Sequence, residues 1–348
     1  LRGHLGWVGG VAFSADGKTV ASGGHDAAVD LALRHFEAQI AHDRARAQTL
    51  GRGDHRDRRP PQREADRGDA QLGGRPEKSN WTISYTQASG AFTTLWVAQE
   101  AGLFKKHGLE GSLKLLNSQV AAQALMAGEV DVISVGPEFV NARLQGAPVK
   151  YIGGTLQRFI FQLWAVKSVS SLADLKGKTV AVTTPRTSTE IATREALKKT
   201  GVISDKDVSF LYAQSIPAIL SSLLSGKTSA GTLSAPNTLK ARDAGLNLVL
   251  DIAQTNVPGL HHAYGTTEKT IKSNPNSLYA FLKAVSEATV LAKNNPSVAK
   301  KAIGKYTETD DAKMIDGTYE QFAPYWDANL AVRSDPIQGQ LMYLDEKE

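Results

Sequence analysis

The chain has 348 residues, with 41% hydrophobic and 22% charged residues, a formal net charge of +5 and no cysteine. This length suits two or three lobes with sizeable cores, the lack of cysteine excludes disulfides and thiolate sites, and no apolar run approaches the ~20 residues of a membrane span. Acidic and basic residues are interspersed after residue 81, so the net charge does not indicate nucleic-acid binding.

Residues 1–33 have the pattern of a β-hairpin, with apolar residues on both sides of an Asp16-Gly17 turn signal. The segment resembles one WD40 repeat in its order Gly3-His4, VAFSADGKTVASGG and Asp26, without the closing Trp-Asp dipeptide of that family. One repeat cannot bury its own faces, and a propeller needs about four to eight blades. We therefore expect a WD40-like fragment and no working propeller.

Residues 34–80 predict a disordered polar linker, because Leu72 is the only large aliphatic residue between Gly51 and Asn80. The abrupt change of composition after Asp26 suggests that residues 1–80 come from a misjoined or frame-shifted reading upstream of a real domain. No secretory signal is visible, since a basic start followed by an apolar stretch and a small-residue cleavage site is missing.

From Trp81 onward, short apolar runs alternate with amphipathic segments of helical length, which is typical of an α/β protein with a largely parallel sheet. We expect strands at 81–85, 113–116, 130–135, 149–153, 163–166, 208–212 and 246–251. We expect helices at 93–107, 118–128, 137–146, 188–199 and 216–224, and helix starts with a capping Asn at Asn274-Pro275 and Asn295-Pro296.

Four segments in this order carry a resemblance to a known family: SGAFTTLWVAQEAGLFKKHGLE, ALMAGEVDVISVG, SSLADLKGKTVAV and KSNPNSLYAFLKAV. They resemble the nitrate, sulfonate and taurine branch of ABC-importer substrate-binding proteins, the NMT1/THI5-like family with the type II periplasmic-binding fold. The resemblance implies two α/β lobes, joined by two crossover strands, that clamp a ligand in the cleft between them. It places lobe one at 81–167 and 258–348, and lobe two at 168–257.

Two departures from the family pattern bear on the details. In this family each lobe carries a helix that ends in Leu-x-x-Gly and is followed by a strand that starts with an acidic residue. In the second copy, Ser229 takes the place of the usual Asp. The family also continues beyond the equivalent of Leu344, so we expect a truncated C-terminal helix.

In open α/β sheets, ligands bind beyond the carboxyl ends of the strands, where helix N-termini present free N–H groups to an oxyanion. In lobe one the candidate ligand contacts are Ser89, Gly90, Phe92, Thr93, Gly136, Glu138, Thr155 and Arg158. In lobe two they are Thr184, Arg186, Thr187, Ser188, Thr189, Gln214, Ser234 and Asn237.

Each candidate also has a structural interpretation. Gly90 would allow close backbone approach, whereas Thr93 is equally well a helix cap. Glu138 would contact an amine, as in taurine, or be a favourable acid in the first turn of a helix. Arg158 and Arg186 could form forked pairs with an oxyanion, and for Arg158 a solvent-facing position is the alternative.

Aromatic and histidine side chains are further candidates. Six aromatic residues could line an apolar wall of the ligand site or lie in the core, namely Phe92, Phe159, Phe161, Trp164, Tyr212 and Tyr264. His261 and His262 point to opposite sides of an extended chain, so they do not jointly hold a metal, and we expect surface or hinge histidines.

The sequence therefore predicts the solute-binding component of an ABC importer, with no cofactor, no metal and no enzymatic activity. The expected ligand is a small anion such as an aliphatic sulfonate, taurine or nitrate, and Glu138 with Arg186 favours an amino-sulfonate. The resemblance implies a membrane permease as partner and a periplasmic or extracytoplasmic, membrane-anchored location, and we expect a monomer. The alternative is binding or synthesis of a thiamine pyrimidine precursor; the synthase relies on a cysteine-rich motif, which this chain lacks.

Overall fold

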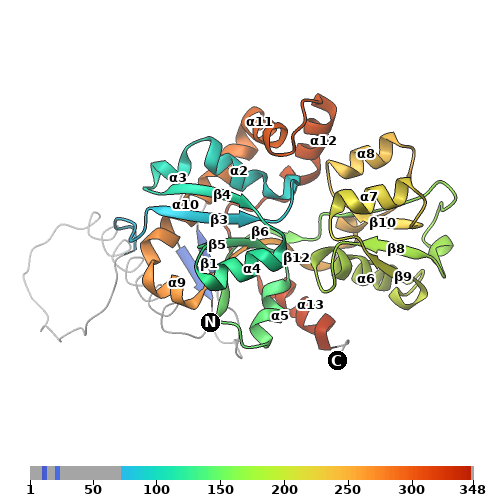
Figure 1. Ribbon diagram of the computed structural model, residues 1–348, viewed down its shortest axis with the longest axis horizontal. Helices are drawn as coiled ribbons and strands as arrows, with labels where there is room; N and C mark the ends of the chain where they lie inside the picture. Colours follow the sequence, from blue (N-terminus) through green and yellow to red (C-terminus); the bar gives the residue numbers. More distant parts are fainter. Residues whose placement is uncertain (1–9, 14–19, 24–71, 346–348) are drawn as a thin grey trace, which may run out of the picture.

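The computed structural model describes residues 10–13, 20–23 and 72–345, and its main part consists of two lobes side by side (Figure 1). The strands β1 (Gly10–Phe13) and β2 (Val20–Gly23) pair antiparallel, while the predicted turn at Asp16-Gly17 lies outside the described residues. The predicted linker at 34–80 lies largely outside the described residues, as do most residues of the WD40-like segment.

The first lobe is built on a five-stranded sheet in the order β4-β3-β5-β12-β6. Its strands are β3 (Asn80–Tyr85), β4 (Glu110–Leu115), β5 (Val132–Val135), β6 (Val149–Arg158) and β12 (Pro258–Thr267). The strand β3 is parallel to β4 and β5, whereas β12 is antiparallel to β5 and β6. All four residues of β5 are buried, as expected for a central strand covered on both faces.

Helices cover both faces of this sheet (Figure 1). They are α2 (Thr93–Glu100), α3 (Leu103–Lys106), α4 (Ser118–Ala127), α5 (Glu138–Leu144), α9 (Glu268–Ser273), α10 (Pro275–Asn294), α11 (Pro296–Tyr306), α12 (Ala312–Phe322) and α13 (Ser334–Asp345), with 3-10 turns η1 (Gly90–Phe92) and η5 (Ala323–Tyr325). The single helix predicted at 93–107 is wrong in one respect, because Gly102 adopts a left-handed φ of +67° and divides it in two.

The two predicted helix starts at Pro275 and Pro296 are confirmed. The preceding residues, Asn274 and Asn295, occupy the N-cap positions but make no side-chain cap hydrogen bond. The fixed φ of proline at the first helical position therefore marks these starts, and the asparagine side chains do not contribute the expected cap.

The second lobe is built on a five-stranded sheet in the order β11-β7-β10-β8-β9. Its strands are β7 (Gln162–Ala165), β8 (Thr179–Val182), β9 (Ser209–Tyr212), β10 (Ala230–Leu233) and β11 (Asn247–Asp251). Its helices are α6 (Ser188–Thr200), α7 (Ile216–Leu224) and α8 (Asn237–Asp243), with 3-10 turns η2 (Ala173–Leu175), η3 (Asp205–Asp207) and η4 (Ile252–Thr255).

One predicted strand belongs to the other lobe. The strand expected at 163–166 in lobe one corresponds to β7, which pairs antiparallel with β10 and β11 of the second sheet. The chain therefore crosses between the lobes directly after Arg158, where β6 ends. Three of the four β7 residues are buried, and they fill the position between β10 and β11.

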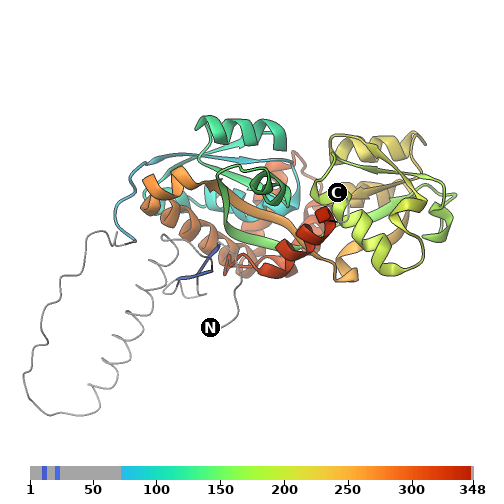
Figure 2. The same ribbon diagram turned by 90° about the horizontal axis from the view of Figure 1, so that it is seen from below.

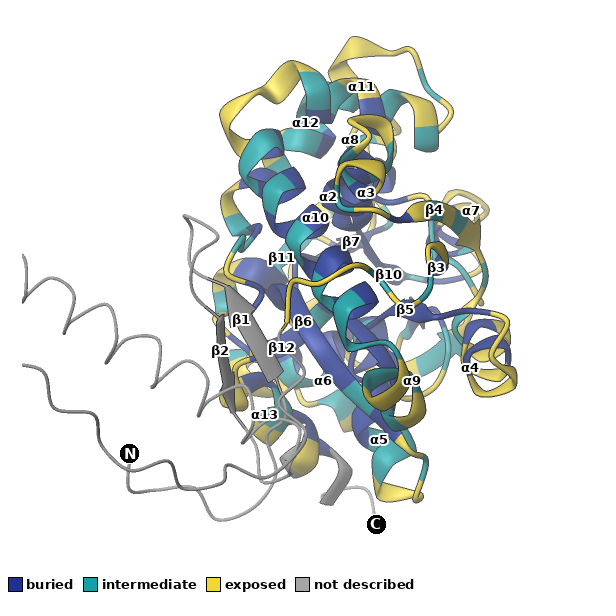
Figure 3. Ribbon diagram, turned by 90° about the vertical axis from the view of Figure 1, so that its left-hand side faces the viewer, coloured by how far each residue is buried: buried dark blue, intermediate teal, exposed yellow. Residues whose placement is uncertain are grey.

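The lobes are joined at the passages from β6 to β7 and from β11 to β12 (Figure 1). The helix α13 lies along the junction between the lobes (Figure 2) and packs against β12. Buried residues gather along the strands and the inward faces of the helices, while exposed residues mark the outer turns (Figure 3). Within the described part of the chain, no helix is both long enough and apolar enough to cross a membrane.

Candidate functional site

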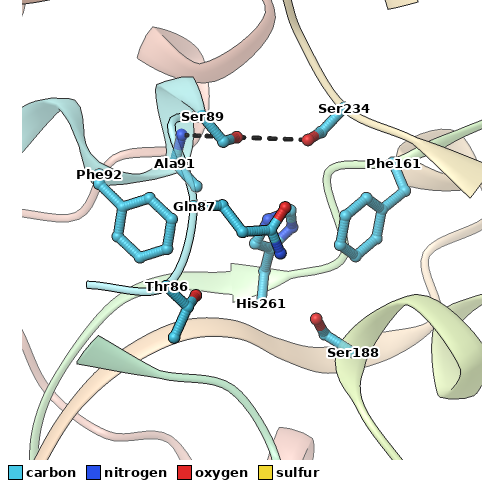
Figure 4. A pocket seen from close by; sticks show the side chains of 9 residues that line it. All are labelled: Thr86, Gln87, Ser89, Ala91, Phe92, Phe161, Ser188, Ser234 and His261. Carbon is cyan, nitrogen blue, oxygen red and sulfur yellow. Dashed lines mark hydrogen bonds between the residues drawn. The ribbon is translucent and has the colours of Figure 1, made fainter. Parts of the chain in front are cut away.

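A small cavity of about 20 Å³, partly open to solvent, lies where the lobes meet (Figure 4). It is lined by Thr86, Gln87, Ser89, Ala91, Phe92, Phe161, Ser188, Ser234 and His261. Five of these residues follow β3 in lobe one, two come from lobe two, and Phe161 and His261 lie near the two crossings. The cavity therefore depends on both lobes.

The loop after β3 contacts lobe two directly. The hydroxyl oxygens of Ser89 and Ser234 lie 3.2 Å apart, and the backbone N–H of Gly90 donates to the carbonyl of Ala235 at 3.4 Å. Ser89 also caps η1 by accepting from the backbone N–H of Ala91 at 3.4 Å. The two serines therefore mark the place where the lobes touch across the cavity.

Gly90 has a structural reason to be glycine. A Cβ at this position would lie 2.6 Å from side-chain atoms of both Thr318 and Phe322 in α12. Close packing between η1 and α12 thus requires glycine here, independently of any ligand.

In the lobe-two segment 183–189, most hydroxyl groups form hydrogen bonds with other groups of the same segment. Thr183 Oγ1 lies 3.0 Å from Thr187 Oγ1 and 2.7 Å from Thr189 Oγ1, and Thr187 donates to the carbonyl of Thr184 at 2.7 Å. Among the predicted contacts of this segment, Ser188 at the first position of α6 is the one that lines the cavity.

Arg186 is exposed and does not line the cavity. Its φ of +61° forms a tight turn, and its backbone N–H donates to Glu190 Oε2 at 2.6 Å. The predicted forked pair between Arg186 and an oxyanion therefore has no support from the cavity.

Further predicted contacts also lie outside the cavity lining. The hydroxyl of Thr93 donates to the carbonyl of Gly90 at 2.8 Å, while the N-cap position of α2 is Phe92 and carries no side-chain cap hydrogen bond. The hydroxyl of Thr155 contacts His262, and the guanidinium of Arg158 lies 5.8 Å from the ring centre of Tyr325.

In lobe two, Gln214 is exposed with a φ of +71°, while Asn237 is buried at the start of α8. In lobe one, Gly136 and Glu138 lie together beside β12, outside the cavity lining. Ligand-binding roles for these residues stay predictions.

Glu138 has the most perturbed carboxyl of the described residues. A Cβ on Gly136 would lie 2.9 Å from Glu138 Oε2 and 3.3 Å from the carbonyl oxygen of Leu260. The Oε2 atom is buried without a hydrogen-bond partner, and burial raises the pKa of Glu138 to about 7, although backbone hydrogen bonds lower it.

The adjacent histidines face different surroundings, as predicted. The Nδ1 atom of His261 accepts from the backbone N–H of Ile160 at 2.9 Å, while the ring of His262 lies between the hydroxyls of Ser134 and Thr155. Burial lowers the pKa of each to about 3, so both rings are neutral at physiological pH.

Of the expected surface or hinge positions, the surface alternative is wrong for His262, and both histidines lie on β12 after the crossing from lobe two. His261 lines the cavity, and His262 is 1% exposed. Thr86 and Gln87 also line the cavity and are not among the predicted contacts, although they follow the first predicted strand directly. Their position after a strand end was the available signal.

None of the nine lining residues carries a formal charge when His261 is neutral. Hydroxyl, amide and imidazole groups supply the polar atoms, and Phe92 and Phe161 supply apolar surface. In the part of the chain that the structure describes, no group of three or more His, Cys, Asp or Glu residues is arranged to hold a metal ion.

The family described as NMT1/THI5 like matches residues 89–299 of this chain. Because the match begins at residue 89, it lends no support to the WD40-like resemblance of residues 1–33. No curated protein matches the sequence.

Solved structures share the fold at low sequence identity. The alkanesulfonate-binding protein SsuA from Xanthomonas axonopodis pv. citri, bound to MOPS, has a TM-score of 0.64 and 16% identity over 78% of this chain and 92% of that one. The periplasmic aliphatic sulphonate binding protein SsuA from Escherichia coli has a TM-score of 0.64 and 18% identity, with the same coverage of 78% and 92%. The periplasmic nitrate-binding protein NrtA from Synechocystis PCC 6803 has a TM-score of 0.61 and 17% identity over 70% of this chain and 71% of that one.

Proposed function

This chain belongs to the NMT1/THI5-like family, and we propose that it is the solute-binding component of an ABC import system. Its ligand is a small anion held between the two lobes. Its partner is a membrane permease, it works as a monomer outside the cytoplasm, and it breaks no bond in the ligand.

The observation that carries this proposal is the cavity shared by both lobes. Ser89 of lobe one and Ser234 of lobe two lie 3.2 Å apart at its edge, and Ser188 opens the 13-residue helix α6 beside it. A helix N-terminus presents free N–H groups and a partial positive charge, so together with these hydroxyls it favours an anion.

Closure of the lobes follows from the same contacts. A ligand that bridges Ser89 and Ser234 binds the closed arrangement more tightly than an open one, because an open arrangement separates the two hydroxyls. Ligand binding therefore shifts the population toward the closed state, which is the form that a permease can recognise.

Two ligand classes fit best, a sulfonate without an amine and nitrate. Proteins that bind an alkanesulfonate and nitrate share this fold, and the lining offers neutral donors for an oxyanion. The earlier preference for an amino-sulfonate loses its basis, because neither Glu138 nor Arg186 lines the cavity.

A thermal-shift screen of the whole chain tests this function. We expect stabilisation by ethanesulfonate or nitrate, with taurine and bicarbonate weaker, since a ligand at about 100 times its Kd adds about 2.7 kcal/mol to the unfolding free energy. Stabilisation by a hydroxymethylpyrimidine alone would contradict the anion and favour the pyrimidine alternative. A screen in which no compound stabilises the chain would contradict the binding role.

A pair of serine variants connects any binding to the cavity. Ser234→Ala removes a lining hydroxyl and should weaken affinity for the stabilising anion by about tenfold, the loss of roughly one hydrogen bond to a charged group. Ser112→Ala changes an exposed serine on β4 and should leave affinity unchanged. Equal effects of the two substitutions, measured by calorimetry, would place the ligand elsewhere.

A further inference from the structure

The ring of His261 is held in one orientation at the cavity. It stacks on Phe161 with ring centres 4.2 Å apart and planes at 19°, and it meets the edge of Phe322 at 5.8 Å and 88°. Its Nδ1 atom accepts a hydrogen bond from the backbone N–H of Ile160 at 2.9 Å. These contacts restrict both rotation and flipping of the imidazole.

The hydrogen bond from Ile160 also decides which ring nitrogen carries the proton. A nitrogen that accepts an N–H cannot itself be protonated, so the neutral ring of His261 must carry its proton on Nε2. Among the residues that the structure describes, Nε2 of His261 has no hydrogen-bond partner. The neighbouring His262 differs, because hydroxyls of Ser134 and Thr155 contact both of its ring nitrogens.

We propose that His261 is a ligand-contact residue, which donates its Nε2–H as a neutral hydrogen-bond donor to an oxygen of the bound oxyanion. This inference rests on the proposed function and names a side chain that hydrogen-bonds the ligand in that site. The ring lines the same cavity as Ser89, Ser188 and Ser234, so its donor and the three hydroxyls can serve one ligand.

The same geometry defines the ligand's chemistry. A cavity with neutral donors and no lining Lys or Arg attracts an anion through hydrogen bonds and the α6 N-terminus, without a formal ion pair. Phe92 and Phe161 add apolar surface beside these polar groups. A short alkanesulfonate fits this description better than a ligand with an ammonium group, for which the lining offers no carboxylate.

Nitrogen NMR of the full chain with ¹⁵N-labelled histidine tests the tautomer and the contact directly. We expect His261 to show the neutral Nε2–H form at pH 7, and its Nε2 signal to move when ethanesulfonate or nitrate is added. A proton on Nδ1, or an Nε2 signal that stays in place while the anion binds, would overturn the assignment.

Substitutions separate the donor from the ring. His261→Phe keeps an aromatic ring but removes the donor and should weaken anion affinity by about tenfold or more, whereas His261→Gln supplies an amide donor and should recover most of that loss. His107→Phe, at a histidine that directly follows α3 and pairs with Glu287, should leave affinity unchanged.

The outcomes distinguish this inference from the proposed function. If the unsubstituted chain binds an anion and His261→Phe binds it equally well, His261 is not a contact although the binding role stands. If His261→Gln loses as much affinity as His261→Phe, donation from Nε2 is refuted. If the unsubstituted chain binds none of the anions, the proposed function itself fails.

Discussion

The buried carboxyl of Glu138 next to β12 should make the stability of the fold depend on pH. Glu138 is the first residue of α5, and its carboxyl lies beside Gly136 and β12. The Oε2 atom is buried without a hydrogen-bond partner. Burial raises the pKa of Glu138 from 4.5 to about 7, against the lowering effect of hydrogen bonds from the backbone of Gly136 and of Glu138 itself. The folded chain therefore holds this proton more tightly than the unfolded chain does.

This difference makes stability depend on pH in a known direction. Below pH 4.5 the carboxyl is protonated in both states, and its contribution is fully present. Between pH 4.5 and about 7 the unfolded state ionises first, so stability falls as pH rises. A rise from 4.5 to about 7, at about 1.4 kcal/mol per pKa unit, corresponds to a loss of up to about 3 kcal/mol above pH 7.

The substitution Glu138→Gln removes the ionisable group while keeping its shape. We expect the variant to be up to about 3 kcal/mol more stable than the parent at pH 8, and about equally stable at pH 4. Urea unfolding at pH 4, 6 and 8 measures this difference. Glu129→Gln, at an exposed position after α4, is the control and should leave the pH dependence of unfolding as it is. Equal stability of Glu138→Gln and the parent at pH 8 would refute the reasoning.

Three further predictions concern packing and charge. Gly259→Ala places a Cβ 2.1 Å from Phe159 Cε2, so the unfolding free energy in urea should fall by about 1–3 kcal/mol; an unchanged midpoint would contradict this. Asp131→Ala removes the acceptor for Lys78 Nζ at 2.6 Å and for the backbone N–H of Thr82 at 2.9 Å. The unfolding free energy in urea should fall by about 2–3 kcal/mol, and a decrease below the error of the measurement would contradict this. Arg186→Ala should change anion affinity in calorimetry by less than about twofold, because the side chain is exposed outside the cavity; a large loss would return Arg186 to the site.

Local patterns predicted much of the fold from sequence. The apolar runs that became β3 and β5, and the proline-marked starts of α10 and α11, depend on residues close together in the chain. Hydrophobic periodicity, turn residues and the fixed φ of proline act over a few residues, so a single sequence contains them. The break at Gly102 could not be predicted in this way, because a glycine within a helical pattern is compatible with a continuous helix and with two helices.

The candidate site was predicted only in part, and the reason is geometric. Sequence reasoning placed Ser89, Phe92, Ser188 and Ser234 at strand ends facing a cleft, and the structure brings these four to one cavity. It could not tell that Arg186 lies in an exposed turn, because that depends on the hydrogen bond to Glu190 and a positive φ. A side chain's direction after a strand end is set by such contacts and not by residue type.

The sequence by itself determined the family, the alternation of strands and helices, and the kinds of side chain available to hold an anion. Only the tertiary structure decided which of them meet. Ser89 and Ser234 are 145 residues apart in the chain yet 3.2 Å apart in space, and His261 reaches the cavity because a crossing strand carries it there beside Phe161. Such contacts arise from the packing of two lobes against each other, which no local pattern encodes.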